Sequence, residues 1–337
     1  MRCRALSIGL CAAFTLAGAT ACASANSGHS AASGHTVTAK LGILQPEGTA
    51  TTNSAEQFAK LASKYSNGTV NIKVYANGTL GSTDTEAEAL VNNTQQFFVT
   101  PDIDSIVPAV DALELPYLFP SAATAGEVLN GPGLNVLWNQ FEAHNVKILG
   151  VYEVGYADIL TTSKAISTPA DLSGLRIRVF DPTVGIPVFS QVHADGLNLA
   201  AGQLVTALST HAIDGLDSAP CTIQTSGWTS AAKHLAVTDH EWVSAPVAMS
   251  YQFWKGLSAS QQQAVTKAFK QTLPSELQAT QQCNTAAIAK MKASGVTVTY
   301  PNQASFKNAF SPVYAQLEKK YGPVIKALQT AISKGSE

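Results

Sequence analysis

The chain has 337 residues, a formal net charge of −2 at pH 7 and only 13% charged residues. This length allows two domains, or one large domain, with ample room for a hydrophobic core. The near-balanced charge, without a polybasic run or a basic stripe, argues against nucleic acid as a partner. We therefore predict a weakly charged globular protein whose surface depends largely on uncharged polar residues.

The N-terminus has the pattern of a secretory signal peptide. Arg2 and Arg4 precede a largely apolar run over residues 5–21, and this run ends in small residues that are typical of a cleavage site. We therefore expect residues 1–22 to be a signal peptide and the mature protein to be extracytoplasmic, with no later apolar run long enough to span a membrane.

Cys22 directly follows these small residues, as the modified cysteine does in bacterial lipoproteins. The match is imperfect, because Ala19 stands where leucine is usual. Cleavage after Ala23 is the alternative and would give a periplasmic or secreted protein. We expect a lipidated Cys22 that anchors the protein to the outer face of the cell membrane, followed by a flexible tether over residues 23–35.

Strands and helices alternate over the next part of the chain. Alternating apolar residues predict strands over 37–44, 69–75 and 95–100, and capping boxes at Ser54 and Thr83 predict a helix after each of the first two strands. This is the βαβ alternation of an α/β domain with parallel strands.

The remaining elements are less regular. A proline interrupts the apolar segment 113–119, and we expect breaks in two long helices at Pro274 and at Gly322-Pro323. Further strands are predicted over 146–152, 159–160, 175–180 and 296–300, and further helices over 134–141, 188–192, 204–208, 260–293 and 311–334.

The segment 175–180 carries the most informative side chains. Arg176 and Arg178 alternate there with apolar residues, and they are the only arginines after the first few residues of the chain. An arginine on an apolar strand is costly to bury unless it meets an anion or a carboxylate. Arg178 lies nearer the carboxyl end of the strand, the edge at which ligands bind in α/β sheets. The strand alone is compatible both with a ligand carboxylate and with a structural salt bridge.

Two cysteines, Cys221 and Cys283, remain after the signal peptide and Cys22. An extracytoplasmic location permits a disulfide between them, and two buried free thiols are equally compatible with the sequence. The chain contains no C-x-x-C motif, which argues against zinc or redox chemistry at the cysteines.

Several short segments stand in a fixed order along the chain, and together they resemble one family. They are Tyr75-Ala76-Asn77-Gly78-Thr79-Leu80-Gly81, with Ala76 in place of a usual proline, Leu115-Pro116-Tyr117-Leu118-Phe119, residues 167–179, Thr206-Ala207-Leu208, Asp214-Gly215, Asp239-His240 and Phe253-Trp254. Their order resembles the solute-binding proteins of tripartite ATP-independent periplasmic (TRAP) transporters, of the C4-dicarboxylate-binding type. The resemblance extends over roughly residues 37–314.

The resemblance implies a fold of the periplasmic-binding-protein kind. We expect two α/β domains joined by a hinge of crossing strands, a long helix that spans both domains, and a ligand cleft that closes between them. Domain I is expected to comprise residues 36–154 and about 243–282, and domain II residues 155–242 and about 283–337.

The resemblance also implies a function. The protein would capture a small organic acid and deliver it to the TRAP permease subunits in the membrane, without catalysis and without a cofactor. A ligand-binding sensor for a membrane signalling protein and, with less support, an extracytoplasmic enzyme are the alternatives. The chain has no G-x-S-x-G motif, and His234 and His240 are six residues apart rather than the three or four of a helical metal site.

In this family, an arginine on a strand of the second domain binds the ligand carboxylate with two parallel hydrogen bonds. The matching residue is Arg178, and we expect Arg176 to be a solvated or salt-bridged neighbour. Asp181 or Asp217 could instead neutralise Arg178. Other family positions differ here: Ala157 replaces a usual arginine, Asp217 and Ser218 replace glutamate and asparagine, and Ala201 replaces an aromatic residue.

These replacements remove a positive charge and leave room, so we expect a different or bulkier ligand with less total charge. Asp158 could bind a ligand hydroxyl or amine, with a surface carboxylate as its alternative role. Tyr156 is a further candidate, with core packing as its alternative. From loops after strands of the first domain, the remaining candidates for the ligand site are Thr100, Asp102 and Glu47.

Overall fold

The computed structural model of the protein describes residues 35–101 and 103–335. All strands of this part belong to one nine-stranded sheet, whose order is β2-β1-β3-β8-β4-β7-β5-β6, with β9 beside β8. The predicted α/β class is therefore confirmed. The strands are β1 (Val37–Ile43), β2 (Val70–Tyr75), β3 (Phe97–Val99), β4 (Val146–Thr161), β5 (Arg176–Arg178), β6 (Asp195–Leu197), β7 (Gly215–Ser218), β8 (His234–Ser250) and β9 (Thr297–Thr299).

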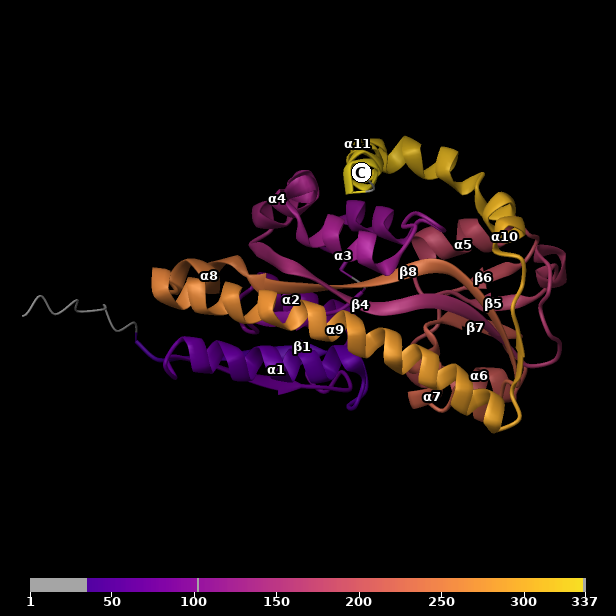
Figure 1. Cartoon of the computed structure of the whole chain (residues 1–337), viewed down its shortest axis with the longest axis horizontal. Helices are drawn as coiled ribbons and strands as arrows, with labels where there is room; N and C mark the ends of the chain where they lie inside the picture. The colour runs from indigo at the N-terminus through magenta and orange to yellow at the C-terminus, as the bar shows by residue number, and fades with distance from the viewer. Residues whose placement is uncertain (1–34, 102, 336–337) are drawn as a thin grey trace, which may run out of the picture. The chain divides into compact units, whose positions relative to one another are not determined.

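Helices cover both faces of the sheet (Figure 1). They are α1 (Ala50–Tyr65), α2 (Thr83–Val91), α3 (Ala122–Asn130), α4 (Asn135–Ala143), α5 (Pro182–Ser190), α6 (Leu204–Ser209), α7 (Pro220–Thr225), α8 (Tyr251–Gly256), α9 (Ala259–Ala293), α10 (Gln303–Phe310) and α11 (Val313–Gly335). Short 3₁₀ helices occupy Pro108–Glu114, Pro132–Leu134, Pro169–Leu172, Ala201–Gln203 and Trp228–Ser230.

The first three strands form the predicted βαβ units, because β1 pairs in parallel with both β2 and β3. The helix starts differ from the prediction. Thr49 caps α1 by accepting from the backbone N–H of Thr52, so the helix begins before the expected box at Ser54. Ser82 likewise caps α2, one residue before Thr83. In both cases a hydroxyl just upstream satisfies the first free N–H groups of the helix.

The long antiparallel strands β4 and β8 form the centre of the sheet and pair along most of their length. The sequence predicted β4 as two short strands and did not predict β8. Both strands are buried along nearly their whole length. Strands covered on both faces lose the apolar–polar alternation by which strands are recognised, which explains the omission. Their register shifts at three places, between Ile148 and Gly150, Glu153 and Gly155, and Ala157 and Ile159.

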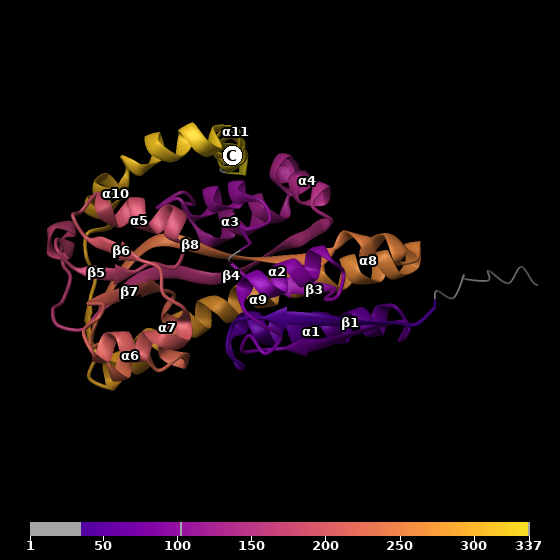
Figure 2. The ribbon, with the colours of Figure 1, turned by 180° about the vertical axis from the view of Figure 1, so that it is seen from behind.

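The hydrophobic core has one part on each face of the sheet and a third part at one end. Figures 1 and 2 show α5, α10 and α11 on one face of β4, β5, β7 and β8, and α6 and α7 on the other. Phe189 and Phe310 belong to the core under α5 and α10. Leu204 and Leu216 belong to the core under α6. The third part contains the aromatic cluster of Phe58, Phe97, Tyr152 and Phe269.

Helix α9 is 35 residues long and begins at Ala259, and the preceding Ser258 caps it in a capping box with Gln261. It passes through Pro274 as one helix, so the break expected there does not occur. In α11 the interruption is present, because Tyr321 has non-helical backbone angles just before Gly322-Pro323. In the described part of the chain, no helix has both the length and the apolarity needed to cross a membrane.

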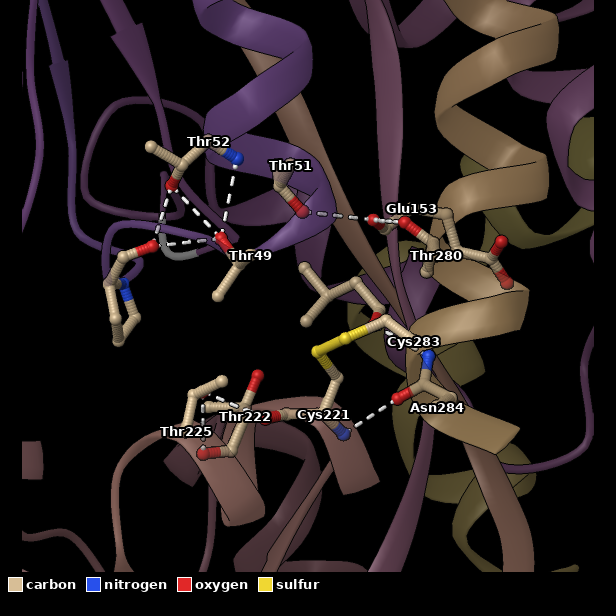
Figure 3. Close-up of a disulfide and its surroundings, with 12 residues drawn as sticks. Thr49, Thr51, Thr52, Glu153, Cys221, Thr222, Thr225, Thr280, Cys283 and Asn284 are labelled. Atoms are coloured by element: carbon tan, nitrogen blue, oxygen red, sulfur yellow. Dashed lines mark hydrogen bonds between the residues drawn. A yellow bond between two sulfur atoms is a disulfide. The ribbon is translucent and has the colours of Figure 1, made fainter. Parts of the chain in front are cut away.

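Cys221 and Cys283 form a disulfide between α7 and α9, which decides between the two alternatives that the sequence left open (Figure 3). Their Cα atoms are 5.5 Å apart, within the usual range for a disulfide. Asn284 strengthens the same junction: its side-chain oxygen accepts from the backbone N–H of Cys221 at 2.9 Å, and its amide donates to the carbonyl of Val154 at 3.2 Å.

Candidate functional site

The parallel strands β5 and β7 bring the main candidate side chains to one edge of the sheet. Arg178 is the last residue of β5 and pairs with Leu216 of β7 and Leu197 of β6. Ser218, at the end of β7, pairs with Asp158 of β4. Three neighbouring strands therefore place Arg178, Ser218 and Asp158 toward one edge of the sheet, at the carboxyl end of the parallel strands.

Arg178 is buried, with only 7% of the residue exposed, and its guanidinium is held in a defined orientation. Its Nε donates to the carbonyl of Leu199 at 3.1 Å, and its guanidinium carbon lies 5.5 Å from the ring centroid of Phe180. A guanidinium that is held by a hydrogen bond and packs against an aromatic ring loses little further conformational freedom when it binds a planar anion. Such an arginine is well suited to bind a carboxylate.

Arg176, two residues earlier, has a different role. It forms an ion pair with Asp214, with Nε to Oδ2 and Nη2 to Oδ1 both at 3.0 Å, and Nη2 also donates to the carbonyl of His211. The hydrogen bonds from Arg176 are the main reason why the pKa of Asp214 is lowered. Of the two predicted roles for Arg176, solvated or salt-bridged, the structure shows the salt bridge.

Asp217 and Arg178 lie on opposite faces of the sheet. Arg178 and Leu216 are register partners, so their side chains lie on the same face of the sheet. Successive residues of a strand point to opposite faces, so the side chain of Asp217 lies on the other face. Asp217 Oδ2 lies 3.8 Å from His240 Nε2, on the face that α5 and α10 cover. By the same alternation, Ser218 shares the face of Arg178.

Asp158 is completely buried, so its expected alternative role as a surface carboxylate is wrong. Opposite Asp158 the register of β8 jumps from Glu241 to Ala236, which leaves a bulge of four residues, 237–240. Asp158 Oδ1 accepts the backbone N–H groups of Thr238 and Asp239, at 2.9 and 3.0 Å. Burial raises the pKa of Asp158 well above its ordinary value, with the nearby Asp239 as a second cause.

The same bulge is held from the other side by Tyr117, in the apolar segment that resembles the family. Its backbone N–H donates to the carbonyl of His240 at 2.9 Å, and its hydroxyl donates to the carbonyl of Thr238 at 3.0 Å. Tyr117 has a positive φ of 56°, which a non-glycine residue rarely adopts. The bulge is therefore fixed by Asp158 on one side and by Tyr117 on the other.

The other candidate residues lie in different environments. Ala157 is buried and pairs with Glu241, and Tyr156 pairs with Trp242 while packing against the core under α5 and α10. Thr100 is buried directly after β3, whereas Glu47 and Ala201 are exposed. Asp102 and Cys22 lie outside the described residues.

Two groups of buried carboxyl side chains were not recognised in the sequence. Glu276 of α9 accepts the backbone N–H of Glu153, and burial raises the pKa of Glu276 to about 8 and that of Glu153 to about 7. The second group joins Asp111 to Asp181, the residue that caps α5. Burial is the main cause that raises the pKa of Asp111 to about 7 and of Asp181 to about 6.

A small cavity of about 10 Å³ lies beside the disulfide, between the beginnings of α1 and α7. Figure 3 shows threonines of both segments facing it. It is lined by Gln45, Thr49, Ala50, Thr51, Val154, Cys221, Thr222, Thr280 and Cys283. The lining of the cavity comes in part from the loop after β1 and in part from the segment that follows Ser218.

Together, the mixed sheet with two long crossing strands, the helix α9 along it and the fixed arginine at the strand ends define the class of a solute-binding protein. The chain belongs to the bacterial extracellular solute-binding protein family 7, whose profile matches residues 41–320. It is a TRAP transporter solute-binding protein, as the order of its motifs predicted.

Several relatives resemble the chain along most of its length. The C4-dicarboxylate-binding periplasmic protein DctP of Rhodobacter capsulatus is 26% identical over 276 residues, which is 80% of this chain and 82% of that protein. The sugar acid binding protein of Advenella mimigardefordensis, solved with galactonate, is 25% identical with a TM-score of 0.83, over 89% and 99% of the two chains. A Bradyrhizobium TRAP solute-binding protein, solved with galacturonate, is 26% identical with a TM-score of 0.81, over 87% and 100%.

Proposed function

We propose that the protein captures a small organic acid by its carboxylate, which Arg178 binds, and delivers it to the TRAP permease subunits in the membrane. The single observation that carries this proposal is the buried guanidinium at the carboxyl end of β5, oriented by Leu199 and Phe180. A guanidinium can bind a carboxylate through two parallel hydrogen bonds, which gives both affinity and orientation.

The relatives support a hydroxylated monocarboxylate as the ligand class. Galactonate and galacturonate, named with two of the solved relatives, each carry one carboxylate and several hydroxyl groups. Ala157 provides no second cation in the position where the family resemblance implies an arginine. A ligand with one carboxylate fits a site with one arginine better than a dicarboxylate does.

The proposed arrangement further includes the two domains with the boundaries expected above, and a lipid anchor at Cys22. The anchor is supported by the position of Cys22 after small residues. Replacement of Cys22 by serine should release the protein from the membrane fraction. If the variant stays in that fraction, the protein is held there by something other than lipid on Cys22.

The function can be tested by calorimetric titration of the mature protein with galactonate, galacturonate and succinate. We expect at least one sugar acid to bind, and we expect Arg178→Ala to weaken its binding by at least about 100-fold, the loss typical of removing a charged hydrogen-bond partner. Arg178→Lys should also bind poorly, because the ammonium group lacks the fork of two donors.

Arg176→Lys is the matched control, because it changes an arginine of the same strand whose partner is Asp214. Its affinity for the sugar acid should stay within about threefold of the unchanged protein. If Arg178→Ala retained full affinity, Arg178 would not be the carboxylate site. If none of the acids bound to the unchanged protein, the proposed ligand class would be wrong.

A further inference from the structure

We propose that Asp217, His240 and Glu241 form a binding site for a divalent transition-metal ion. Each side chain offers one possible ligand atom, a histidine nitrogen or a carboxylate oxygen, and these three atoms lie within 4.8 Å of one another. Asp217 comes from β7, His240 from the bulge of β8 and Glu241 from the residue after that bulge, so no spacing within one helix predicts them. Asp217 and His240 lie on the α5–α10 face of the sheet, opposite the face of Arg178.

The three side chains of this group are almost completely buried. Asp217 and His240 are each 1% exposed and Glu241 is 4% exposed. Two carboxylates taken out of water at this separation repel one another strongly unless a positive charge neutralises them.

Asp217 Oδ1 and His240 Nε2 have no hydrogen-bond partner in the described part of the chain. The distance of 3.8 Å between His240 Nε2 and Asp217 Oδ2 is too long for a hydrogen bond. Two ligand atoms bound to zinc at tetrahedral angles lie about 3.4 Å apart, because each is about 2.1 Å from the metal. His240 Nε2 and Asp217 Oδ2 therefore need to approach each other by less than an ångström to bind the same ion.

The surroundings of His240 prepare it as a ligand. Its Nδ1 lies 2.8 Å from the hydroxyl of Thr238, so a proton on Nδ1 can be donated to that oxygen and the lone pair is left on Nε2. The rings of Phe189 and Phe310 pack against the imidazole with centroids at 5.9 Å and fix its plane. One imidazole with two carboxylates suits zinc, manganese or cobalt better than an alkali ion.

The test uses the mature protein without an affinity tag, dialysed against a chelator and then titrated calorimetrically with Zn²⁺. No organic acid is present, so the result does not depend on the proposed ligand. We expect one ion per chain, and visible absorption bands of a Co²⁺ complex when cobalt replaces zinc. Asp217→Asn and Glu241→Gln should each weaken Zn²⁺ binding at least tenfold. Asp195→Asn, which changes an exposed aspartate on β6, is the matched control and should bind like the unchanged protein.

Crystals grown with Zn²⁺ give a second measurement that needs no variant to fold. An anomalous difference peak between Asp217, His240 and Glu241 would support the site. The proposal is overturned if no binding occurs up to millimolar Zn²⁺, if Asp217→Asn and Glu241→Gln fold but bind as well as the unchanged protein, or if the anomalous peak lies at other residues.

Discussion

Asp158 illustrates how one side chain can serve the backbone of a distant strand. Its carboxyl group occupies the space opposite the four-residue bulge of β8 and accepts two N–H groups that would otherwise have no partner in the sheet. Unsatisfied buried donors are costly, so this acceptor stabilises the bulge that carries His240.

Asp158→Ala should lower the free energy of unfolding by about 2 to 4 kcal/mol, because the N–H groups of Thr238 and Asp239 lose their acceptor. Asp158→Asn should cost less than half as much, because its side-chain oxygen can accept both bonds. Urea denaturation of both variants would measure the difference, with Asp195→Ala as an exposed control. Equal losses for the asparagine and alanine variants would mean that the negative charge, and not the acceptor, is what stabilises the bulge.

The sequence predicted single residues with unequal success. Arg178 was predicted as a candidate because arginine is rare in this chain and the strand around it alternates regularly, and the structure places it at the end of β5. The structural role of Asp158 could not be predicted, because it depends on a bulge some 80 residues later in the chain, where Asp239 has a φ of 45°. Nor could the sequence bring Asp217 and His240 together, since a histidine facing an aspartate across two strands leaves no periodic signal.

At the scale of elements, a disulfide and a shared asparagine hold the junction of α7 and α9 together. The disulfide and Asn284 connect α7 to the middle strand β4 through α9. Gly155 has a φ of 126°, and a side chain there would collide with Asn284. This explains why glycine is required where the register of β4 shifts.

The double substitution Cys221→Ser and Cys283→Ser should lower the free energy of unfolding by up to about 4 kcal/mol. The disulfide joins residues 62 positions apart, and the estimate follows from the chain entropy that a loop of this length removes from the unfolded state. Urea denaturation would measure the loss, and the unchanged protein treated with a reductant should show the same loss. Unchanged stability in both cases would contradict this role.

Elements with one exposed face were predicted well, and fully buried elements were not. The amphipathic helix α1 and the alternating strands β1 and β2 lie close to their expected ranges. Strand β8 was missed, and β4 was split in two, because helices cover both faces of the centre of the sheet and remove the alternation. The crossing strands were predicted from the resemblance to a family, because the pattern of apolar and polar residues does not reveal them.

At the scale of the whole molecule, the buried carboxyl groups give stability an unusual dependence on pH. In the unfolded chain, aspartates and glutamates lose their protons near pH 4. In the folded protein the pKa is raised to about 8 for Glu276, about 7 for Glu153 and Asp111, and about 6 for Asp181. At pH values between about 4 and the raised pKa of each group, the unfolded chain binds fewer protons than the folded protein does.

The free energy of unfolding should therefore fall as the pH rises from about 5 to about 8. The fall is about 1 kcal/mol per pH unit for each group that is protonated in the folded protein and deprotonated in the unfolded chain. Urea denaturation at several pH values would measure this slope. Glu276→Gln should reduce the slope at the upper end of the range, because its amide has no proton to lose. A free energy of unfolding that rises over this range would contradict the raised pKa values.

The register shifts of β4 and β8 also have a mechanical consequence. The two strands run without a break from one end of the sheet to the other, so a change of angle between the ends must be absorbed by twisting peptide units where the ladder is already interrupted. We propose that the stiffness of these two strands sets the rate at which the two ends of the sheet separate to release the ligand.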